Sequence, residues 1–284
     1  MTTAAESLTG TRCSQFHHNP PFIRTIVRVI TFPDIGPGEP LSVSASLYVT
    51  YLRCAGQALA QCQGRYGPES RASFAGMLAH RIFARHLSAG PIVTTGFEAA
   101  CRQEIGQAMN PKLAALQLRP SELRGVIAEV GALYERFQAV SVARCRRVEA
   151  EITYEVSAEV TLRGRIDAVF DDPRGVRLVD WKTGSLGTVE HQLDFYALLW
   201  TLEHGEPPAV VEAASVASGE RYEQHPTPES LTTTAARVAE LIDTLRSGFV
   251  DENSVQRTGG PGCRFCPLHE ECAEGLAALR VLSA

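Results

Sequence analysis

The chain has 284 residues, a formal net charge of −5 at pH 7, 44% hydrophobic and 21% charged residues. This composition is typical of a globular protein with one large domain and excludes a disordered or fibrous chain. No segment is apolar enough to span a membrane, and the opening residues lack the apolar core of a secretory signal. We therefore expect a cytoplasmic protein whose eight cysteines are not organised as disulfides. Because the net charge is negative, any nucleic-acid binding would need a local basic face.

The first half of the chain is predicted to hold one strand and several helices. Alternating apolar residues predict a strand from Phe22 to Phe32, and the Pro- and Gly-rich stretch after it predicts a loop. Apolar residues at a spacing of three to four predict helices from about Ser46 to Gln63 and from Ser73 to Leu87. The segment 91–137 is also predicted to be helical, with Ser121 capping its last helix.

The second half is predicted to hold the central strands. Thr188 is expected to cap a helix that carries Gln192 and Tyr196, which lie four residues apart and therefore share one helix face. Glu151 lies on the strand predicted at Val148–Ser157. It is interpreted as a surface residue rather than as an acidic residue at the edge of a catalytic site. The remaining elements are predicted strands at Val148–Ser157, Ala158–Phe170, Val176–Lys182 and Ala209–Val216 and a helix at Glu229–Arg246.

Two of these strands carry acidic residues at positions that would bring them together. Asp180 and Lys182 lie two residues apart on one strand and therefore point to the same side. A turn at Pro173, with Gly175 free to take a positive φ, would fold a hairpin with Asp167 opposite Asp180, about 5 Å apart at Cβ. A one-residue slip would move Asp167 to the other face. Two carboxylates that close repel each other, so we expect a divalent metal ion between them.

The D-x-K sequence alone is weak evidence, because such a tripeptide on a strand is usually a solvated edge or a surface ion pair. Composition strengthens the interpretation. Lys112 and Lys182 are the only lysines of a chain that otherwise uses arginine for positive charge. A lysine in that background suggests a point charge beside an attacking water, which a planar guanidinium would not supply.

Three cysteines lie close together in the sequence GCRFCPLHEECAEG near the C-terminal end. Cys263 and Cys266 form a C-x-x-C pair that presents two thiolates to one metal, and Cys272 follows after a short spacer. A tetrahedral zinc ion or an iron–sulfur cubane normally needs four ligands, so one ligand is missing from this segment. Cys101 and Cys145 are interpreted as ordinary buried or free thiols.

The sequence GRIDAVF…VRLVDWKTG…QLDFY resembles the core of the PD-(D/E)XK nucleases, in particular their RecB-type exonuclease branch. The proline of the family name is replaced here by Ile166. Asp167 matches the first carboxylate of the family. Asp180 and Lys182 match its D/E-x-K motif, and Gln192 and Tyr196 match its Q-x-x-x-Y motif.

The resemblance implies two further ligands. RecB-type nucleases usually carry a histidine four residues after a glycine on an earlier helix, which His80 matches after Gly76 in FAGMLAHRIF. Some members, including the AddB subunit and the CRISPR-adaptation nucleases, have a structural iron–sulfur cluster that joins two distant parts of the chain. One of its cysteine ligands lies alone, early in the chain. In the similar stretch SASLYVTYLRC that residue is Cys54, with Cys13 and Cys62 as alternatives. The resemblance thus implies a [4Fe–4S] cluster, rather than zinc, on Cys54 and the three late cysteines.

For the fold, the resemblance implies an α/β protein with a restriction-endonuclease-like core. A mixed central sheet would be flanked by helices, with a helical insertion at about 91–137 and a cysteine loop at 259–275. The chain would divide into an N-terminal strand and loop, 1–41, and a nuclease domain, 42–284.

For the chemistry, the resemblance implies Mg²⁺- or Mn²⁺-dependent hydrolysis of DNA, as single strands or ends, alongside a helicase, recombination or CRISPR-adaptation protein. His80, Asp167 and Asp180 would bind the metal, and Lys182 would orient the attacking water. Gln192 and Tyr196 would hold the DNA strand or support the Lys182 loop.

Three other classes of protein explain less of the sequence. A catalytically inactive DNA-binding subunit of a repair complex would have lost an acid or the lysine, and all are present. A zinc-stabilised protein without catalysis would explain the cysteines but not the acidic residues. An electron-transfer protein would explain a cluster alone.

Overall fold

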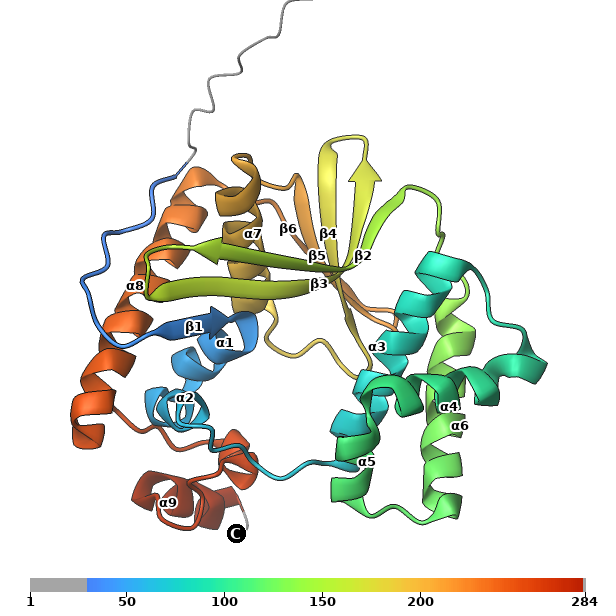
Figure 1. The fold of residues 1–284 in the computed structure, drawn as a ribbon, viewed down its shortest axis with the longest axis horizontal. Coiled ribbons are helices and arrows are strands. Elements are labelled where there is room, and N and C mark those ends of the chain that lie inside the picture. Colours follow the sequence, from blue (N-terminus) through green and yellow to red (C-terminus); the bar gives the residue numbers. More distant parts are fainter. Residues whose placement is uncertain (1–29, 283–284) are drawn as a thin grey trace, which may run out of the picture.

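The computed structural model describes residues 30–282, which form a mixed six-stranded sheet flanked by helices (Figure 1). The α/β class and the mixed central sheet are therefore confirmed. The strands are β1 (Leu41–Ser44), β2 (Cys145–Glu155), β3 (Val160–Asp172), β4 (Gly175–Lys182), β5 (Val210–Ser215) and β6 (Arg221–Gln224). The α-helices are α1 (Ala45–Arg53), α2 (Ala55–Cys62), α3 (Arg71–Ala89), α4 (Phe97–Ala108), α5 (Asn110–Leu116), α6 (Pro120–Phe137), α7 (Glu190–His204), α8 (Pro228–Val250) and α9 (Ala273–Leu282). No helix within these described residues combines the length and the apolar character needed to cross a membrane.

The sheet splits beside β3. Its order is β1-β3-β4-β5-β6, with β2 along the other edge of β3. On the shared edge, β1 pairs in parallel with residues 160–163 of β3, and β4 pairs antiparallel with residues 168–172. Among the described residues, no strand therefore pairs with 164–167 on that edge. The gap between the end of β1 and the end of β4 is where polar side chains can gather.

The β3–β4 hairpin folds as the sequence predicts. Asp172 pairs with Gly175, so the turn lies at Pro173 and Arg174. Gly175 has a φ of 137°, which a residue with a Cβ rarely adopts. The predicted register, and with it the predicted turn, is confirmed.

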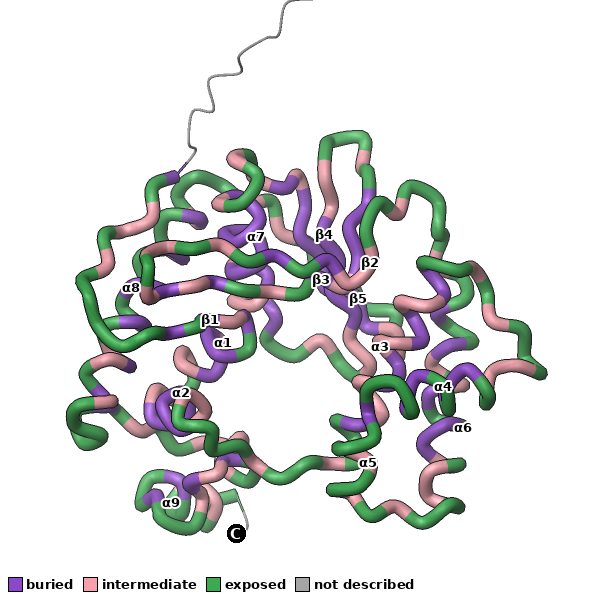
Figure 2. The backbone as a smooth tube through the Cα atoms, in the orientation of Figure 1, coloured by how far each residue is buried: buried purple, intermediate pink, exposed green. Residues whose placement is uncertain are grey.

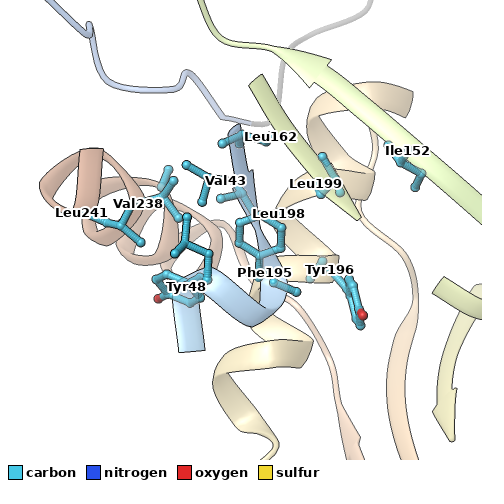
Figure 3. Close-up of a cluster of buried hydrophobic side chains, with 14 of the residues drawn as sticks. Val43, Tyr48, Ile152, Leu162, Phe195, Tyr196, Leu198, Leu199, Val238 and Leu241 are labelled. Carbon is cyan, nitrogen blue, oxygen red and sulfur yellow. The ribbon is translucent and has the colours of Figure 1, made fainter. Parts of the chain in front are cut away.

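Two hydrophobic cores lie on the two faces of the sheet. On one face, α1, α7 and α8 bury Tyr48 and Phe195 against Leu162 of β3 (Figure 3). On the other face, α3, α4 and α6 form a second core, in which Phe83 stacks on Phe137 with ring centroids 4.1 Å apart. Figure 2 shows the buried residues concentrated along the central strands and on α7. Apolar burial on both faces is the main stabilising term and makes the sheet a rigid support.

The helix predicted from Ser46 to Gln63 is in fact two helices, α1 and α2, interrupted at Cys54. Cys54 has an extended backbone, with φ −161° and ψ 108°, and its N–H donates to the Thr50 carbonyl to close α1. The interruption brings Cys54 Sγ to the C-terminal loop, where the Thr258 N–H donates to it at 3.4 Å. Apolar periodicity continues across the break, which is why the sequence pattern does not reveal it.

Two predicted helix caps are wrong. Ser121 is the second residue of α6, and the Arg119 N–H donates instead to the Glu122 carboxylate at 2.7 Å. Thr188 lies one residue too early, because Val189 occupies the cap position of α7. In both cases the hydroxyl residue is close to the start of the helix, but the chain reaches helical geometry at a neighbouring residue.

The short edge strands are also missing from the sequence prediction. The strand predicted at Phe22–Phe32 lies mostly outside the described residues, and Ile30 to Phe32 are irregular. Each of β1 and β6 has only four residues, too few for a clear alternation.

Candidate active site

Asp167 and Asp180 meet where β3 and β4 leave the hairpin ladder. Ala168 and Val179 are the last paired residues, and extending their register by one residue sets Asp167 opposite Asp180. The Trp181 backbone N–H donates to Asp167 Oδ2 at 2.7 Å, which ties the first carboxylate to the second strand. Asp180 is only 5% exposed. The hairpin therefore holds two acidic groups together at the split in the sheet.

Lys182 and helix α7 surround Asp180 with polar groups. Lys182 Nζ lies 2.7 Å from Asp180 Oδ2 and donates to Gln192 Oε1 at 2.6 Å. The Gln192 amide donates to Asp180 Oδ1 at 2.9 Å and to the Tyr196 hydroxyl at 3.1 Å. In Figure 3 that hydroxyl points away from the apolar side chains around Tyr196. Because an amide can accept and donate at once, Gln192 links the lysine to the carboxylate.

Helix α3 brings His80 to the same place. His80 Nδ1 lies 3.1 Å from Asp167 Oδ1. One turn earlier, a Cβ on Gly76 would lie 3.4 Å from Thr183 Oγ1, so a glycine lets the helix sit close to the end of β4. The six predicted residues that line one cavity of about 440 Å³ are His80, Asp167, Asp180, Lys182, Gln192 and Tyr196.

Burial and like charge perturb the acidic groups of the site. Burial, and then the charge of Asp167, raise the pKa of Asp180 to about 6, although Lys182 lies beside it. Burial lowers the pKa of His80, but the charges of Asp167 and Asp180 outweigh it and leave the pKa above its ordinary value. Burial also raises the pKa of Tyr196, so its hydroxyl stays protonated. Both Asp180 and His80 therefore favour added positive charge in this cavity.

The surroundings of Asp180 Oδ2 indicate that these residues suit a divalent cation. It is buried and accepts no hydrogen bond from the described residues, because its contact with Lys182 lacks hydrogen-bond geometry. Two carboxylates and an imidazole are donors that Mg²⁺ and Mn²⁺ accept. In the arrangement seen over residues 30–282, no three His, Cys, Asp or Glu side chains are already placed to hold a metal ion. Here His80 pairs with Asp167 and Lys182 with Asp180.

Glu149 is an acidic neighbour of the site that the sequence interpretation missed. Interpolating the β2–β3 register sets it opposite Asp167. Its φ is 49°, its carboxylate pairs with Arg165 at 2.9 Å, and its charge contributes to the raised pKa of His80. Glu151, the acid considered from the sequence, is exposed. Alternation along a regular strand cannot reveal a residue whose backbone leaves strand geometry.

The cysteines form a second cluster, away from the carboxylates. Backbone N–H groups donate to three of the sulfurs at 3.3–3.4 Å. Burial raises the pKa of Cys266, and the charges of the other three cysteines add to that effect. All of the cysteines in the described residues are free thiols. The four that line one cavity of about 230 Å³ are Cys54, Cys263, Cys266 and Cys272.

The remaining cysteines do not line this cavity. Burial raises the pKa of Cys62 to about 11 and, for Cys101, to about 12, so both thiols stay neutral. Burial also raises the pKa of Cys145. Cys13, the other alternative ligand, lies outside the described residues. Among the early cysteines of residues 30–282, Cys54 is therefore the one that lines a cavity with the late ones.

If His80 is a metal ligand, as the sequence predicts, replacing it with Ala should weaken Mn²⁺ binding by about tenfold or more, because an imidazole next to Asp167 is lost. Any metal-dependent activity should return in part when excess Mn²⁺ is added, by mass action. Titration of free Mn²⁺ by electron paramagnetic resonance measures the affinity. His225→Ala, an exposed histidine outside the cavity, is the matched control. Unchanged Mn²⁺ affinity in His80→Ala would make His80 a structural residue.

Mn²⁺ affinity should fall as the pH is lowered from about 8 to 5. Asp180, with a pKa of about 6, and His80, with a raised pKa, must both lose a proton before they can bind a cation. Protons therefore compete with Mn²⁺ over a range well above the ordinary pKa of a carboxylate. The same titration at several pH values checks this. A profile that is flat down to pH 5 contradicts it.

A family model of the PD-(D/E)XK nuclease superfamily matches residues 42–273. A solved structure from Eubacterium rectale, described as a "putative exonuclease", is similar with a TM-score of 0.51 and 16% identity, over 85% of this chain and 92% of that one. The structure of SSO0001 has a TM-score of 0.32 and 17% identity, over 70% of this chain and 95% of that one, and supports no inference about the fold. No curated protein matches the chain. At 16% identity, the first likeness concerns the fold alone.

Proposed function

The chain belongs to the PD-(D/E)XK nuclease superfamily, and on that basis we propose that it is a metal-dependent nuclease that degrades DNA from ends or as single strands. One observation carries the proposal. Asp167 and Asp180 share a cavity with Lys182, and Asp180 Oδ2 is buried there without a hydrogen bond. Phosphodiester hydrolysis requires an activated water and compensation of the phosphate charge, and this set of groups can provide both.

In the proposed mechanism, Asp167, Asp180 and His80 hold Mg²⁺ or Mn²⁺, with the Trp181 carbonyl as a further donor. The bound ion supplies Lewis-acid chemistry, by lowering the pKa of water and offsetting charge on the phosphate. The carboxylates contribute fixed negative charge at the split in the sheet. Because like charge raises the pKa of Asp180, the pair gains most from a cation.

Lys182 is proposed to orient the attacking water and to stabilise charge in the transition state. Its ammonium donates to Gln192 Oε1 at 2.6 Å and forms an ion pair with Asp180 Oδ2 at 2.7 Å. Gln192 fixes this direction through its own bonds to Asp180 and Tyr196. Gln192 and Tyr196 therefore act as positioning residues, and preorganised donors of this kind cost no reorganisation during the reaction.

DNA is the proposed substrate, and action at ends is the first possibility to test because the fold resembles that of a protein described as an exonuclease. A helicase, recombination or CRISPR-adaptation protein is the proposed kind of partner, in the cytoplasm. Any basic face for the phosphates must be local, since the net charge is −5.

For the second cluster, we propose a structural [4Fe–4S] centre on Cys54, Cys263, Cys266 and Cys272. Four sulfur donors suit either zinc or iron–sulfur. All four cysteines line one cavity, and the resemblance to nucleases that carry an iron–sulfur cluster favours the cluster over zinc. Thiolate-directed backbone N–H groups are typical of such centres and tune their potential.

End-labelled single- and double-stranded DNA, incubated with Mn²⁺ and resolved on gels, tests the nuclease proposal. The native protein is expected to shorten the DNA strand from its labelled or its unlabelled end, and the Lys182→Met variant is not. Methionine keeps roughly the length of the lysine side chain and removes its charge. DNA that is bound but intact would instead identify a catalytically inactive DNA-binding subunit. Metal analysis of the purified protein separates iron–sulfur from zinc.

A further inference from the structure

A second cavity, of about 670 Å³, lies behind the strand that carries Asp180 and Lys182. Trp181, whose side chain points to the opposite face from its two neighbours, forms part of its wall. The end of α6, the loop after it and the β5–β6 turn form the other walls. This volume is in the range of small-molecule binding sites.

The wall of this cavity is positively charged. Arg136, Arg177 and Arg221 line it, and no acidic residue does. Glu212 lies beneath the wall, fully buried. Arg177 Nη1 donates to its Oε2 at 2.8 Å, and Arg221 Nη1 lies 2.8 Å from its Oε1 without a hydrogen bond. One carboxylate cannot neutralise three guanidinium groups, so the cavity favours an anion. The bond to Glu212 also fixes the Arg177 guanidinium in place, which lowers the entropic cost of binding a ligand.

Two N–H donors of the same wall lack acceptors. Trp181 Nε1 and Arg177 Nε are buried and donate to no atom of the described residues. Buried donors are nearly always satisfied in proteins, so their absence of partners points to an acceptor supplied from outside the chain. Both residues line the cavity, and N–H donors of this kind suit the oxygens of a phosphate. Apolar wall residues, Val140, Phe170 and Val216, suit a ring attached to it.

We propose that this cavity binds a nucleotide, with the phosphate on Arg136, Arg177 and Arg221 and the base against the apolar wall. The inference does not depend on the nuclease proposal, because it rests on different side chains. The two sites are nevertheless connected. Val216 lines the cavity and its N–H donates to the Lys182 carbonyl at 2.8 Å. Occupation of the cavity would therefore restrain the end of β4 that carries Lys182.

Trp181 provides a direct readout. The chain has two tryptophans, so Trp200→Phe leaves Trp181 as the only one. Titration of this variant in EDTA with deoxyadenosine 5′-monophosphate should quench or shift the fluorescence of Trp181. Inorganic phosphate should bind more weakly, and deoxyadenosine should not bind. Equilibrium dialysis of the native protein with the labelled nucleotide gives an independent measure, should Trp200→Phe fail to fold.

Three variants assign the site. Arg221→Gln and Arg136→Gln, both at exposed positions, should each weaken nucleotide binding by about tenfold or more, the usual effect of losing a charge-assisted contact. Lys182→Met should leave it unchanged. Competition by a 5′-phosphorylated oligonucleotide would identify a strand end, rather than a free nucleotide, as the source of the ligand.

Several outcomes would overturn the proposal. One is no binding at roughly 10 mM nucleotide. Another is binding that Lys182→Met abolishes and Arg221→Gln spares, which would assign the nucleotide to the carboxylate cavity. Equal affinity for inorganic phosphate and the nucleotide would show that the base contributes nothing to binding, and the cavity would then be a phosphate site and not a nucleotide site. None of these results bears on whether the protein cleaves DNA.

Discussion

Replacing Asp180 with Asn should lower DNA cleavage by about a thousandfold or more, because a metal-binding carboxylate is lost and a metal supplies several kcal/mol of the barrier reduction. The same change should stabilise the fold increasingly as the pH rises from about 4, the ordinary pKa of an aspartate, to about 6. Burial raises the pKa of Asp180 to about 6, so its protonated form stabilises the fold at low pH and this contribution is lost as the pH rises. Asn retains the uncharged form at every pH. Cleavage assays, and thermal unfolding in EDTA at about pH 4 and pH 8, measure the two effects.

The stability gain should be on the order of 1 kcal/mol at pH 8, or a few degrees in Tm, and several times smaller at about pH 4. Loss of the Lys182 contact opposes it and keeps it small. Asp171→Asn is the control, because Asp171 lies on the same hairpin but is exposed and pairs with Arg146. Native cleavage by Asp180→Asn would show that the site is misplaced. A variant destabilised at pH 8 would show that Asp180 acts chiefly as the partner of Lys182.

The hairpin could be predicted because its determinants are local. Alternation assigns Asp180 and Lys182 to one side of a strand, and the turn at Pro173 fixes which residue faces which. Gln192 and Tyr196 are likewise four residues apart on one helix, where spacing alone places them on a common face. Over such short distances along the chain, backbone geometry leaves few alternatives.

The opening of the site depends on contacts between distant parts of the chain, which local patterns do not encode. Leu41–Ser44 pairs with residues 160–163, more than a hundred residues later, and this pairing creates the split beside Asp167. Glu149 lies next to the site, opposite Asp167 in the β2–β3 register, with a φ of 49° that strand alternation does not foresee. His80 and Cys54 entered the interpretation through the family resemblance, since nothing in their own helices distinguishes them from core residues. Tertiary packing decides such positions, and propensity does not.

Replacing Cys54 with Ser should remove most of the iron of the proposed [4Fe–4S] centre and lower Tm by at least about 10 °C. Cys54 Sγ accepts from Thr258, 204 residues later, so a centre shared with Cys263 would close nearly the whole domain into one loop. A cross-link over that length restrains the unfolded chain by about 5 kcal/mol, and metal binding adds to folding free energy directly. For a chain of this size, about 5 kcal/mol corresponds to at least about 10 °C. Metal analysis, visible absorption and thermal unfolding check the three effects together.

Cys62→Ser is the matched control, because Cys62 lies eight residues further on, at the end of α2, and does not line the cysteine cavity. It should keep its iron and its Tm. Activity should fall in Cys54→Ser and not in Cys62→Ser, since the segment joining α2 to α3 is held against the cysteine loop by the Arg65–Glu271 ion pair. Loosening that loop would shift α3 and with it His80. Full iron content in Cys54→Ser would mean that another cysteine is the fourth ligand, and zinc in the native protein would replace the cluster by a tetrahedral site on the same four sulfurs.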